Sequence, residues 1–393
     1  MLYGICASKD VKLSNISRAL QDKIPLIKTE DRLSRNLAKK DYSEQIMDAL
    51  LPVAAKKVEK NMVIAIDPGD VMKPYAQKMA YLCNIYDASQ GEPAQGYHLC
   101  QVTAADLSHT KIIPLYCEGY SHLEPDFTGK TNRLLSIIRK VTQHIGKLGT
   151  WAIDREGDNN EIISFFTASE LKFVTRLKLN RQLRVRRKNE KPMVVKAEDI
   201  EKYTDFNYTS RITKIEDGKE TTISVKYGIL PVALNFDQEE WFNLVVIQGF
   251  GKHPMLLLTN HEPDVKDANQ VWSIVEMYLT RWKCDECYRY VKQSYNLEDF
   301  RVRGYNSIRN IVAMVHAVAY FTCAFLTLSG RLQIMVNRVF VLSKRFFGIP
   351  SFSHYAMADG ICELLKKART GIIEYAGKRG KTFPELQLNL IPL

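Results

Sequence analysis

The middle of the chain alternates between short continuous apolar runs and stretches with a helical spacing of apolar residues. The runs MVIAI at 62–66 and TWAI at 150–153 are short enough to be buried strands, and Asp67 and Asp154 follow them directly. Between the two runs, residues 131–147 carry apolar side chains at a helical period. Strand, helix and strand in this order predict an α/β sheet, in which ligands sit at the carboxyl ends of strands. A Pro-Gly pair follows Asp67, so the first strand is expected to stop there at a turn.

A β-rich pattern replaces this alternation from about residue 185. The segment RITKIEDGKETTISVKY alternates polar and apolar residues around Asp217-Gly218, which predicts a hairpin. A long helical pattern resumes at about 267–293, so the β-rich stretch is interpreted as an insertion into the α/β core.

The two ends of the chain are helical in pattern. The apolar segment 311–328 approaches the length of a membrane span, but His316 interrupts it and arginines flank it. A buried core helix is the better interpretation, and no membrane partner is expected. The predicted division is a helical N-terminal domain and candidate DNA-binding module at 1–58, a first core part at 59–184, a β-rich insertion at 185–262, a second core part at 263–330 and a helical C-terminal region at 331–393.

Basic residues outnumber acidic ones by 55 to 44, which gives a formal net charge of +11. Such an excess suits a polyanionic partner, because each phosphate contact releases counterions. The densest basic stretch is 172–196, for which sequence-independent contact to a DNA backbone and a solvated basic loop are the two interpretations. Its basic residues are Lys172, Arg176, Lys178, Arg181, Arg184, Arg186, Arg187, Lys188, Lys191 and Lys196.

The eight cysteines are scattered and form no dense framework, so reduced thiols are expected. Cys284 and Cys287 form a lone CxxC inside a helical pattern without a second pair. Zinc is therefore not expected at this pair.

One face of the helix predicted around 278–292 gathers four chemically active side chains. An α-helix turns by 100° per residue, so these four side chains, a phenol, a guanidinium, a carboxylate and an ammonium, point in directions within about 60° of each other around the helix axis. A solvated face with charge pairs one turn apart is the plain alternative. Near the second strand, Asp158 and Glu161 predict a capping box for the next helix, whereas Asp154 has no such structural role. The four side chains of the helix face belong to Tyr278, Arg281, Asp285 and Lys292.

These segments together resemble the DDE transposases of bacterial insertion sequences, in particular the IS-four family with its Tyr-Arg-Glu-Lys signature. IDREGD followed by FVTRL, and the spacing Y-x2-R-x3-D-x6-K, are similar to two of its blocks. IDPGDVMKPYAQKMAYL resembles its first catalytic block, and LEDFRVRGYNSIRNIVAMVHAVAYF resembles the segment after its last block. The resemblance covers about residues 60 to 325.

The resemblance implies that Asp67 and Asp154 are the first two catalytic carboxylates. The family's third is a glutamate four residues after the arginine, a position that holds Asp285 here, with Glu286 next to it. Either Asp285 serves with a shorter side chain, or the helix rotates so that Glu286 reaches the metal; a crippled site is the third alternative. The candidate DNA-binding residues are Tyr278, Arg281 and Lys292, by resemblance, together with Arg155, Arg184, Arg186, Arg187 and Lys188.

The fold implied is an RNase H-like α/β catalytic core with an inserted β-rich subdomain and helical N- and C-terminal regions. Two Mg²⁺ ions, replaceable by Mn²⁺, would be held by Asp67, Asp154 and Asp285. The implied activity is strand cleavage at transposon ends and strand transfer into target DNA, by a homodimer on double-stranded terminal inverted repeats, in a bacterial cytoplasm at the nucleoid. The alternatives are a catalytically impaired, transposase-derived DNA-binding protein and another RNase H-like nuclease.

Overall fold

The computed structural model describes residues 1–393 except 88–90, 187–191, 217–218, 344–351 and 368–393. Within these residues the strands form one twelve-stranded mixed sheet in the order β2-β3-β1-β5-β6-β12-β11-β10-β7-β8, with β4 beside β3 and β9 beside β10. The strands are β1 (Val63–Met72), β2 (Cys83–Asp87), β3 (Glu92–Ala105), β4 (Ile112–Tyr120), β5 (Thr150–Ile153), β6 (Phe173–Arg176), β7 (Gln182–Val185), β8 (Met193–Lys196), β9 (Tyr208–Glu216), β10 (Lys219–Leu234), β11 (Asp237–Gln248) and β12 (Met255–Thr259).

Parallel and antiparallel pairing divide this sheet into two parts. β1 runs antiparallel to β3 and parallel to β5, and β5 runs parallel to β6. From β6 onward every pair is antiparallel, so the strands of the β-rich stretch extend the same sheet. β9 and β10 pair from Glu216 and Lys219 outward, as the hairpin pattern predicts. The turn itself, Asp217-Gly218, lies outside the described residues.

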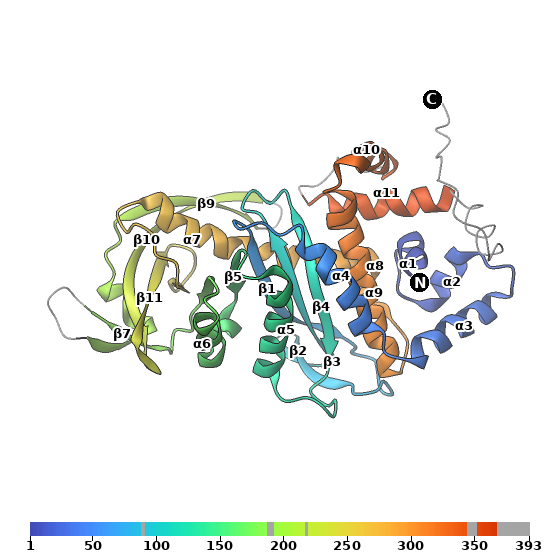
Figure 1. Cartoon of the computed structure of the whole chain (residues 1–393), viewed down its shortest axis with the longest axis horizontal. Coiled ribbons are helices and arrows are strands. Elements are labelled where there is room, and N and C mark those ends of the chain that lie inside the picture. The colour runs from blue at the N-terminus through green and yellow to red at the C-terminus, as the bar shows by residue number, and fades with distance from the viewer. Residues whose placement is uncertain (88–90, 187–191, 217–218, 344–351, 368–393) are drawn as a thin grey trace.

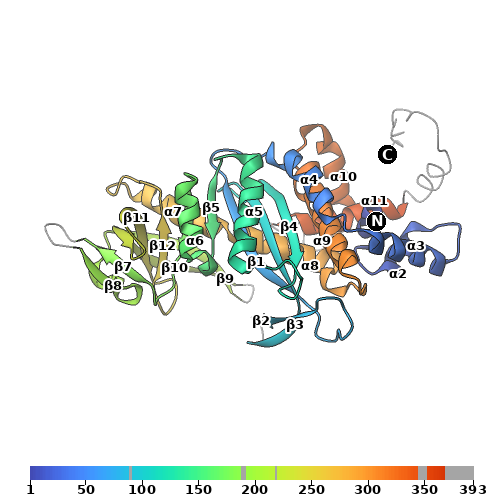
Figure 2. The same ribbon diagram turned by 60° about the horizontal axis from the view of Figure 1, so that its bottom comes forward.

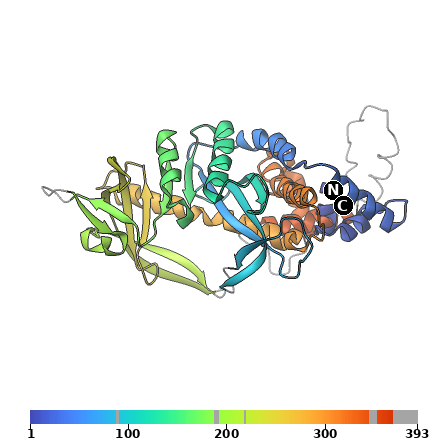
Figure 3. The ribbon, with the colours of Figure 1, turned by 90° about the horizontal axis from the view of Figure 1, so that it is seen from below.

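Helices cover both faces of the sheet (Figures 1 and 3). Successive side chains of a strand point to opposite faces; accordingly Ile64 of β1 packs with α4, α5 and α6, whereas its neighbour Val63 packs with α7. The helices are α1 (Leu2–Ser8), α2 (Leu13–Leu20), α3 (Leu26–Lys39), α4 (Ser43–Ala55), α5 (Lys130–Ile145), α6 (Asn160–Ala168), α7 (Ala268–Thr280), α8 (Trp282–Tyr295), α9 (Tyr305–Tyr320), α10 (Gln333–Leu342) and α11 (His354–Lys367).

The helices of the two chain ends share one apolar core. Residues of α1, α2 and α3 pack in the same cluster as residues of α8, α9, α10 and α11, at one end of the long axis (Figure 1). The helix predicted over 311–328 is α9 and its continuation to Leu326, and 72% of its most apolar stretch is buried inside the protein. The prediction of a core helix is confirmed, because the sheet and neighbouring helices supply its apolar surroundings.

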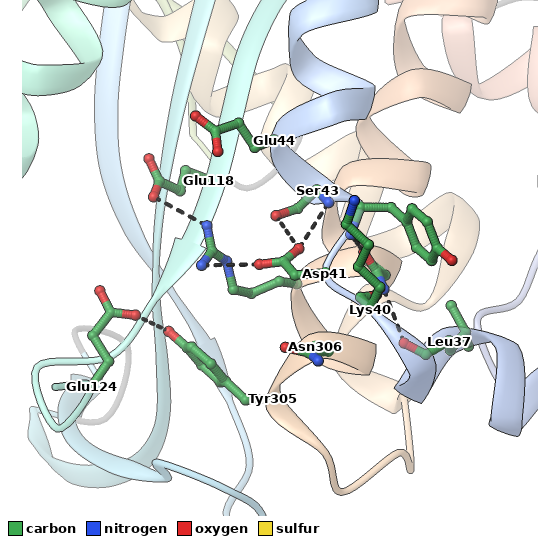
Figure 4. Close-up of polar contacts among 12 residues, drawn as sticks. Leu37, Lys40, Asp41, Ser43, Glu44, Glu118, Glu124, Tyr305 and Asn306 are labelled. Atoms are coloured by element: carbon green, nitrogen blue, oxygen red, sulfur yellow. Dashed lines mark hydrogen bonds and ion pairs between the residues drawn. The ribbon is translucent and has the colours of Figure 1, made fainter. Parts of the chain in front are cut away.

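A charged network ties the N-terminal helices to the sheet (Figure 4). Arg309 of α9 pairs with Asp41, just before α4, at 3.0 Å and with Glu118 of β4 at 3.7 Å. Tyr305, one turn earlier on α9, donates a hydrogen bond to Glu124. α9 is therefore held between the N-terminal segment and the edge of the sheet.

Two sequence-based expectations about element ends are wrong. β1 continues beyond Asp67 to Met72, because β3 is long enough to pair with it from Val63 to Met72. Beyond Ile66 the opposite edge of β1 has no pairing with β5, so the missing N–H of Pro68 breaks no ladder there. The helical pattern at 267–293 is divided into α7 and α8 at Arg281, where two tighter bonds, Arg281 N to Tyr278 O and Cys284 N to Arg281 O, replace the α-helical spacing.

Candidate active site

Two of the predicted acids sit side by side where the parallel pairing of β1 and β5 ends. The parallel register pairs Ile66 of β1 with Ile153 of β5, and Asp67 and Asp154 are the next residues on each strand. Neighbouring strands lie about 4.8 Å apart, so this register alone brings the two backbone positions together.

Asp154 also has a structural role that the sequence interpretation missed. Its Oδ1 accepts a hydrogen bond from Glu156 N at 2.9 Å and so caps a short 3₁₀ helix, Arg155–Gly157. The predicted capping box of Asp158 is wrong: Asn159 caps α6, because the 3₁₀ turn moves the helix start one residue along. Asp158 is instead buried, where it accepts from Lys178 N at 2.8 Å and pairs with Arg181 at 3.2 Å.

The third acid comes from the start of α8. Arg281 Nη1 lies 3.1 Å from Asp67 Oδ1 and 3.0 Å from Asp285 Oδ1, and Arg281 Nη2 lies 3.2 Å from Asp285 Oδ2. The guanidinium is only 8% exposed. Arg281 therefore bridges a strand-end carboxylate and a helix carboxylate that are far apart in sequence.

The electrostatics show that these carboxyl groups crowd one another. Burial raises the pKa of Asp67 well above its usual range, the negative charge of Asp285 adds to the rise, and Arg281 opposes it. Burial also raises the pKa of Asp285 despite the same guanidinium. Asp154 contributes negative potential at both groups. If all three carboxyls are ionised, three negative charges face one guanidinium.

Such a donor set fits a divalent cation. Carboxylate oxygens are the ligands that Mg²⁺ prefers, and cations displace protons from carboxyl groups that hold them too tightly. The pKa of Asp67 is raised first by burial and then by the negative charge of Asp285. The residues that could hold a metal here are Asp67, Asp154 and Asp285.

Glu286, the alternative third acid, points elsewhere. Its carboxylate pairs with Lys283 at 2.8 Å, one turn back on α8. A residue next to Asp285 is rotated by about 100° around the helix, which carries Glu286 away from Asp67. Of the two acids at this position, the structure places Asp285 beside Asp67.

The face of α8 that begins with Arg281 and Asp285 runs along the second half of β1. One turn further, Tyr288 donates a hydrogen bond to the carbonyl of Asp70. Two turns further, Lys292 pairs at 2.8 Å with Glu298. The same Glu298 Oε1 accepts from the backbone N–H of Met72, at 3.0 Å. The far end of this face therefore lies against the end of β1, about 16 Å of strand beyond Asp67.

The structure does not gather the three family-implied phosphate contacts in one place. Tyr278 is 3% exposed and belongs to the apolar cluster of α7. Arg281 is at the carboxylates, and Lys292 is two turns away beside Glu298. Tyr278 nevertheless lies beside Arg281, whose guanidinium carbon is 5.9 Å from the centre of the phenol ring, so that Lys292 alone is distant.

The remaining predicted DNA contacts lie in two regions. Arg155 is exposed and directly follows Asp154. Arg184 lies on β7 and Arg186 is exposed just after it, in a part of the molecule near one end of the long axis, away from β1 (Figures 1 and 2). Arg187 and Lys188 lie outside the described residues. Several basic residues of 172–196 have structural partners, among them Lys172 with Asn260 O and Lys196 with Glu198.

Two supporting residues, Asp70 and Tyr288, were not singled out from the sequence. Asp70 lies three residues after Asp67 on β1, and Tyr288 lies three residues after Asp285 on α8. The side chain of Tyr288 also fills the space beside Gly69, where an added Cβ would come within 3.2 Å of its ring. The spacing of three on α8 is the signal that could have found Tyr288, whereas residues three apart on a strand point to opposite faces, so spacing gave no signal for Asp70.

Comparisons with known proteins leave the family open. No protein-family model matches the sequence, and no curated protein matches it. Among solved structures, the chain is similar to a chain described as "Cryo-EM structure of piggyBac transposase synaptic complex with hairpin DNA", with 10% sequence identity and a TM-score of 0.47. The similarity covers 91% of this chain and 64% of that one, so the chain spans less than two thirds of that transposase.

Proposed function

We propose that the chain is a DNA transposase of the DDE type, in which Asp67, Asp154 and Asp285 hold divalent cations for phosphodiester cleavage. One observation carries the proposal: Asp67 and Asp154 directly follow the last paired residues of β1 and β5, and Arg281 joins Asp67 to Asp285, which is distant in sequence. The carboxyl ends of parallel strands are where ligands bind in α/β sheets. Negative potential concentrated on an otherwise basic chain suits a cation that bridges protein and nucleic acid.

The strand order supports an RNase H-like core. Read from β4, the order is β4-β3-β1-β5-β6, with the first three strands antiparallel and the last two parallel to β1. The acids lie on the central strand of this set and on its parallel neighbour, as the resemblance to the insertion-sequence transposases implies.

Mg²⁺ is the proposed metal, with Mn²⁺ as a substitute, because every proposed ligand atom is a carboxylate oxygen. A pair of such ions would activate the attacking water and stabilise the leaving oxygen of an in-line displacement. The chain's own contribution is positional: β1 and β5 fix two carboxylates on a rigid sheet, and α8 delivers the third. Arg281 holds the carboxylates of Asp67 and Asp285 next to each other. Its N–H groups would also lie beside the site for charge-assisted hydrogen bonds to phosphate.

The finer assignments follow the resemblance and are part of the same proposal. The substrates would be double-stranded terminal inverted repeats and target DNA, joined by a homodimer at the bacterial nucleoid. The exposed Arg155 and the basic β7–β8 region would contact the DNA backbone rather than its sequence.

A plasmid that carries the gene's own flanking repeats tests the proposal. The purified protein should nick it with Mg²⁺ or Mn²⁺ and should join the freed 3′ ends to a second plasmid. Asp67→Asn and Asp154→Asn should abolish both products, whereas Glu161→Gln, which changes an exposed acid of α6, should abolish neither. Hydrolysis without strand transfer would instead identify another RNase H-like nuclease.

One observation favours a second candidate, a DNA-binding protein that no longer cuts. Arg281 is bonded to two of the three proposed metal ligands, and the third ligand is an aspartate where the family has a glutamate. That protein would bind the repeats with wild-type strength in the Asp67→Asn variant and would show no nicking in any form. Metal-dependent nicking that the variant loses excludes it.

A further inference from the structure

A second cluster of metal-ligating side chains lies on β3, the antiparallel neighbour of β1, and at the two strands that pair with the other edge of β3. It consists of Cys83, His98 and His122, whose ligand atoms all lie within 4.8 Å of one another. Cys83 begins β2, His98 lies on β3 and His122 follows the end of β4. β2 and β4 both pair with β3 (Figure 2). The cluster is therefore assembled by strand pairing rather than by a local motif.

The two imidazoles already stand at the spacing of metal ligands. His98 Nε2 lies 3.2 Å from His122 Nδ1. A tetrahedral zinc ion with Zn–N bonds of about 2.0–2.1 Å holds two nitrogens about 3.3 Å apart, and holds a nitrogen and a thiolate sulfur about 3.6 Å apart. The histidine pair therefore needs almost no movement, and the separation between the sulfur and each nitrogen needs to shorten by about 1.2 Å at most.

Asp70 orients this site in the way that outer carboxylates orient metal-bound histidines. Its Oδ1 lies 2.7 Å from His98 Nδ1. A carboxylate only accepts, so Nδ1 carries a proton, and Nε2 is the nitrogen that faces His122 and would bind a metal once it has lost any proton of its own. A carboxylate on the outer nitrogen of a histidine fixes the tautomer and strengthens the inner nitrogen as a ligand.

We propose that Cys83, His98 and His122 form a binding site for one Zn²⁺ ion per chain, with Asp70 as the orienting residue and a fourth position left for water. Thiolate and imidazole together select zinc over magnesium, which takes oxygen ligands. The ion would pin the β2–β3 hairpin to the end of β4. The site is separate from the proposed Mg²⁺ site and does not depend on the proposed DNA chemistry.

Burial distinguishes a metal site from a nucleophilic cysteine. Cys83 is 1% exposed and His98 is 5% exposed, so a bulky substrate cannot reach the sulfur. His122 is only partly buried, and it leaves a path for an ion from solvent. The Cys83 thiol now donates to the carbonyl of Gly96 at 3.3 Å, a weak bond that a metal bond readily replaces.

The test measures metal content, which does not require activity. The full-length protein is purified in excess Mg²⁺ and equilibrated with one equivalent of Zn²⁺ per chain. It should retain one zinc ion per chain by mass spectrometry. Cys83→Ser and His122→Gln should weaken zinc binding at least ~100-fold in competition with a chromophoric chelator, because each removes a direct ligand. Asp70→Asn should weaken it about 10- to 100-fold, because it removes only the orienting carboxylate.

Two variants serve as matched controls. Cys362→Ser changes another buried cysteine whose thiol donates to a backbone carbonyl, that of Ala7 at 3.1 Å. His144→Gln changes an exposed histidine of α5. Both should bind zinc as the wild type does.

Substitution with Co²⁺ keeps the test decisive even where a variant folds poorly. The wild-type protein with Co²⁺ should show the thiolate-to-cobalt charge-transfer band of a bound cysteine. A wild-type protein without this band, or zinc binding that Cys83→Ser and His122→Gln leave unchanged, overturns the proposal.

Discussion

Two clusters on neighbouring strands differ in chemistry although they share one strand. Asp67 and Asp70 are three residues apart on β1, a separation of about 10 Å. The first belongs to a cluster of carboxylates bridged by Arg281, and the second orients a cluster of thiol and imidazoles. Oxygen donors suit Mg²⁺ and sulfur with nitrogen suits Zn²⁺, so the same strand would serve two metals through side-chain identity alone.

The two clusters also differ in whether local sequence or long-range strand pairing brings their side chains together. The pair Asp67 and Asp154 follows from the ends of two short apolar strands, which are visible in the sequence. Cys83, His98 and His122 meet only because β2, β3 and β4 pair in one register. A change in either cluster should therefore leave the metal of the other in place.

The largest expected effect is on cleavage. Asp285→Ala should lower the rate of metal-dependent nicking by at least ~10³-fold, because it removes a proposed metal ligand and leaves Arg281 with one carboxylate partner. Zinc content should remain at one ion per chain in this variant. Nicking at the wild-type rate would show that Asp285 is not a ligand of the metal that carries out cleavage.

Acid should weaken the fold that carries both clusters. Burial lowers the pKa of His316 to about 4, from 6.5. The folded state therefore favours the neutral ring; stability from this group is complete above about pH 6.5 and is lost as the pH falls toward 4. The loss is at most about 3 kcal/mol at 1.36 kcal/mol per pKa unit. His316→Gln should flatten the dependence of urea unfolding on pH across this window.

The exposed histidine of the β11–β12 connection provides the control for this measurement. His253→Gln makes the same substitution at an exposed position and should leave the slope of the wild type in place. An identical slope in the wild type and in His316→Gln would exclude His316 as a source of acid sensitivity.

Zinc should stabilise the wild type and not the Cys83→Ser variant. A ligand at 100 times its dissociation constant adds about 2.7 kcal/mol to the free energy of unfolding, because it binds only the folded site. Thermal unfolding with and without Zn²⁺ measures this difference, and Mg²⁺ at the same concentration should not reproduce it. Equal stabilisation of the variant would place the zinc elsewhere.

The smallest effect is expected at the neighbour of Asp285. Glu286→Ala should weaken nicking by less than about 10-fold, because Glu286 pairs with Lys283, its neighbour one turn away, and not with Asp67 or Arg281. A loss as large as that of Asp285→Ala would make Glu286 the third ligand.

Much of the fold could be predicted from local pattern. The strands that begin at residues 63 and 150, the helix at 131–147 and the buried helix of residues 311–328 are present, because their apolar spacing is complete within each segment. The extension of β1 to Met72 could not be predicted, because its partner β3 lies thirty residues away and overrides the Pro-Gly turn signal. The start of α6 moved for a similar reason, since the 3₁₀ turn at Asp154 leaves Asn159 as the cap.

The sequence by itself determined the short apolar runs that Asp67 and Asp154 follow and the helix that carries Asp285, because strand and helix periods are local properties. Only the tertiary structure decided that Asp285 rather than Glu286 faces Asp67, that Arg281 bridges the acids, and that Lys292 lies apart from them. It alone also brought Cys83, His98 and His122 together. The physical reason is register: the pairing of strands and the rotation of a helix at its break fix which side chains meet, and both depend on partners far away in the chain.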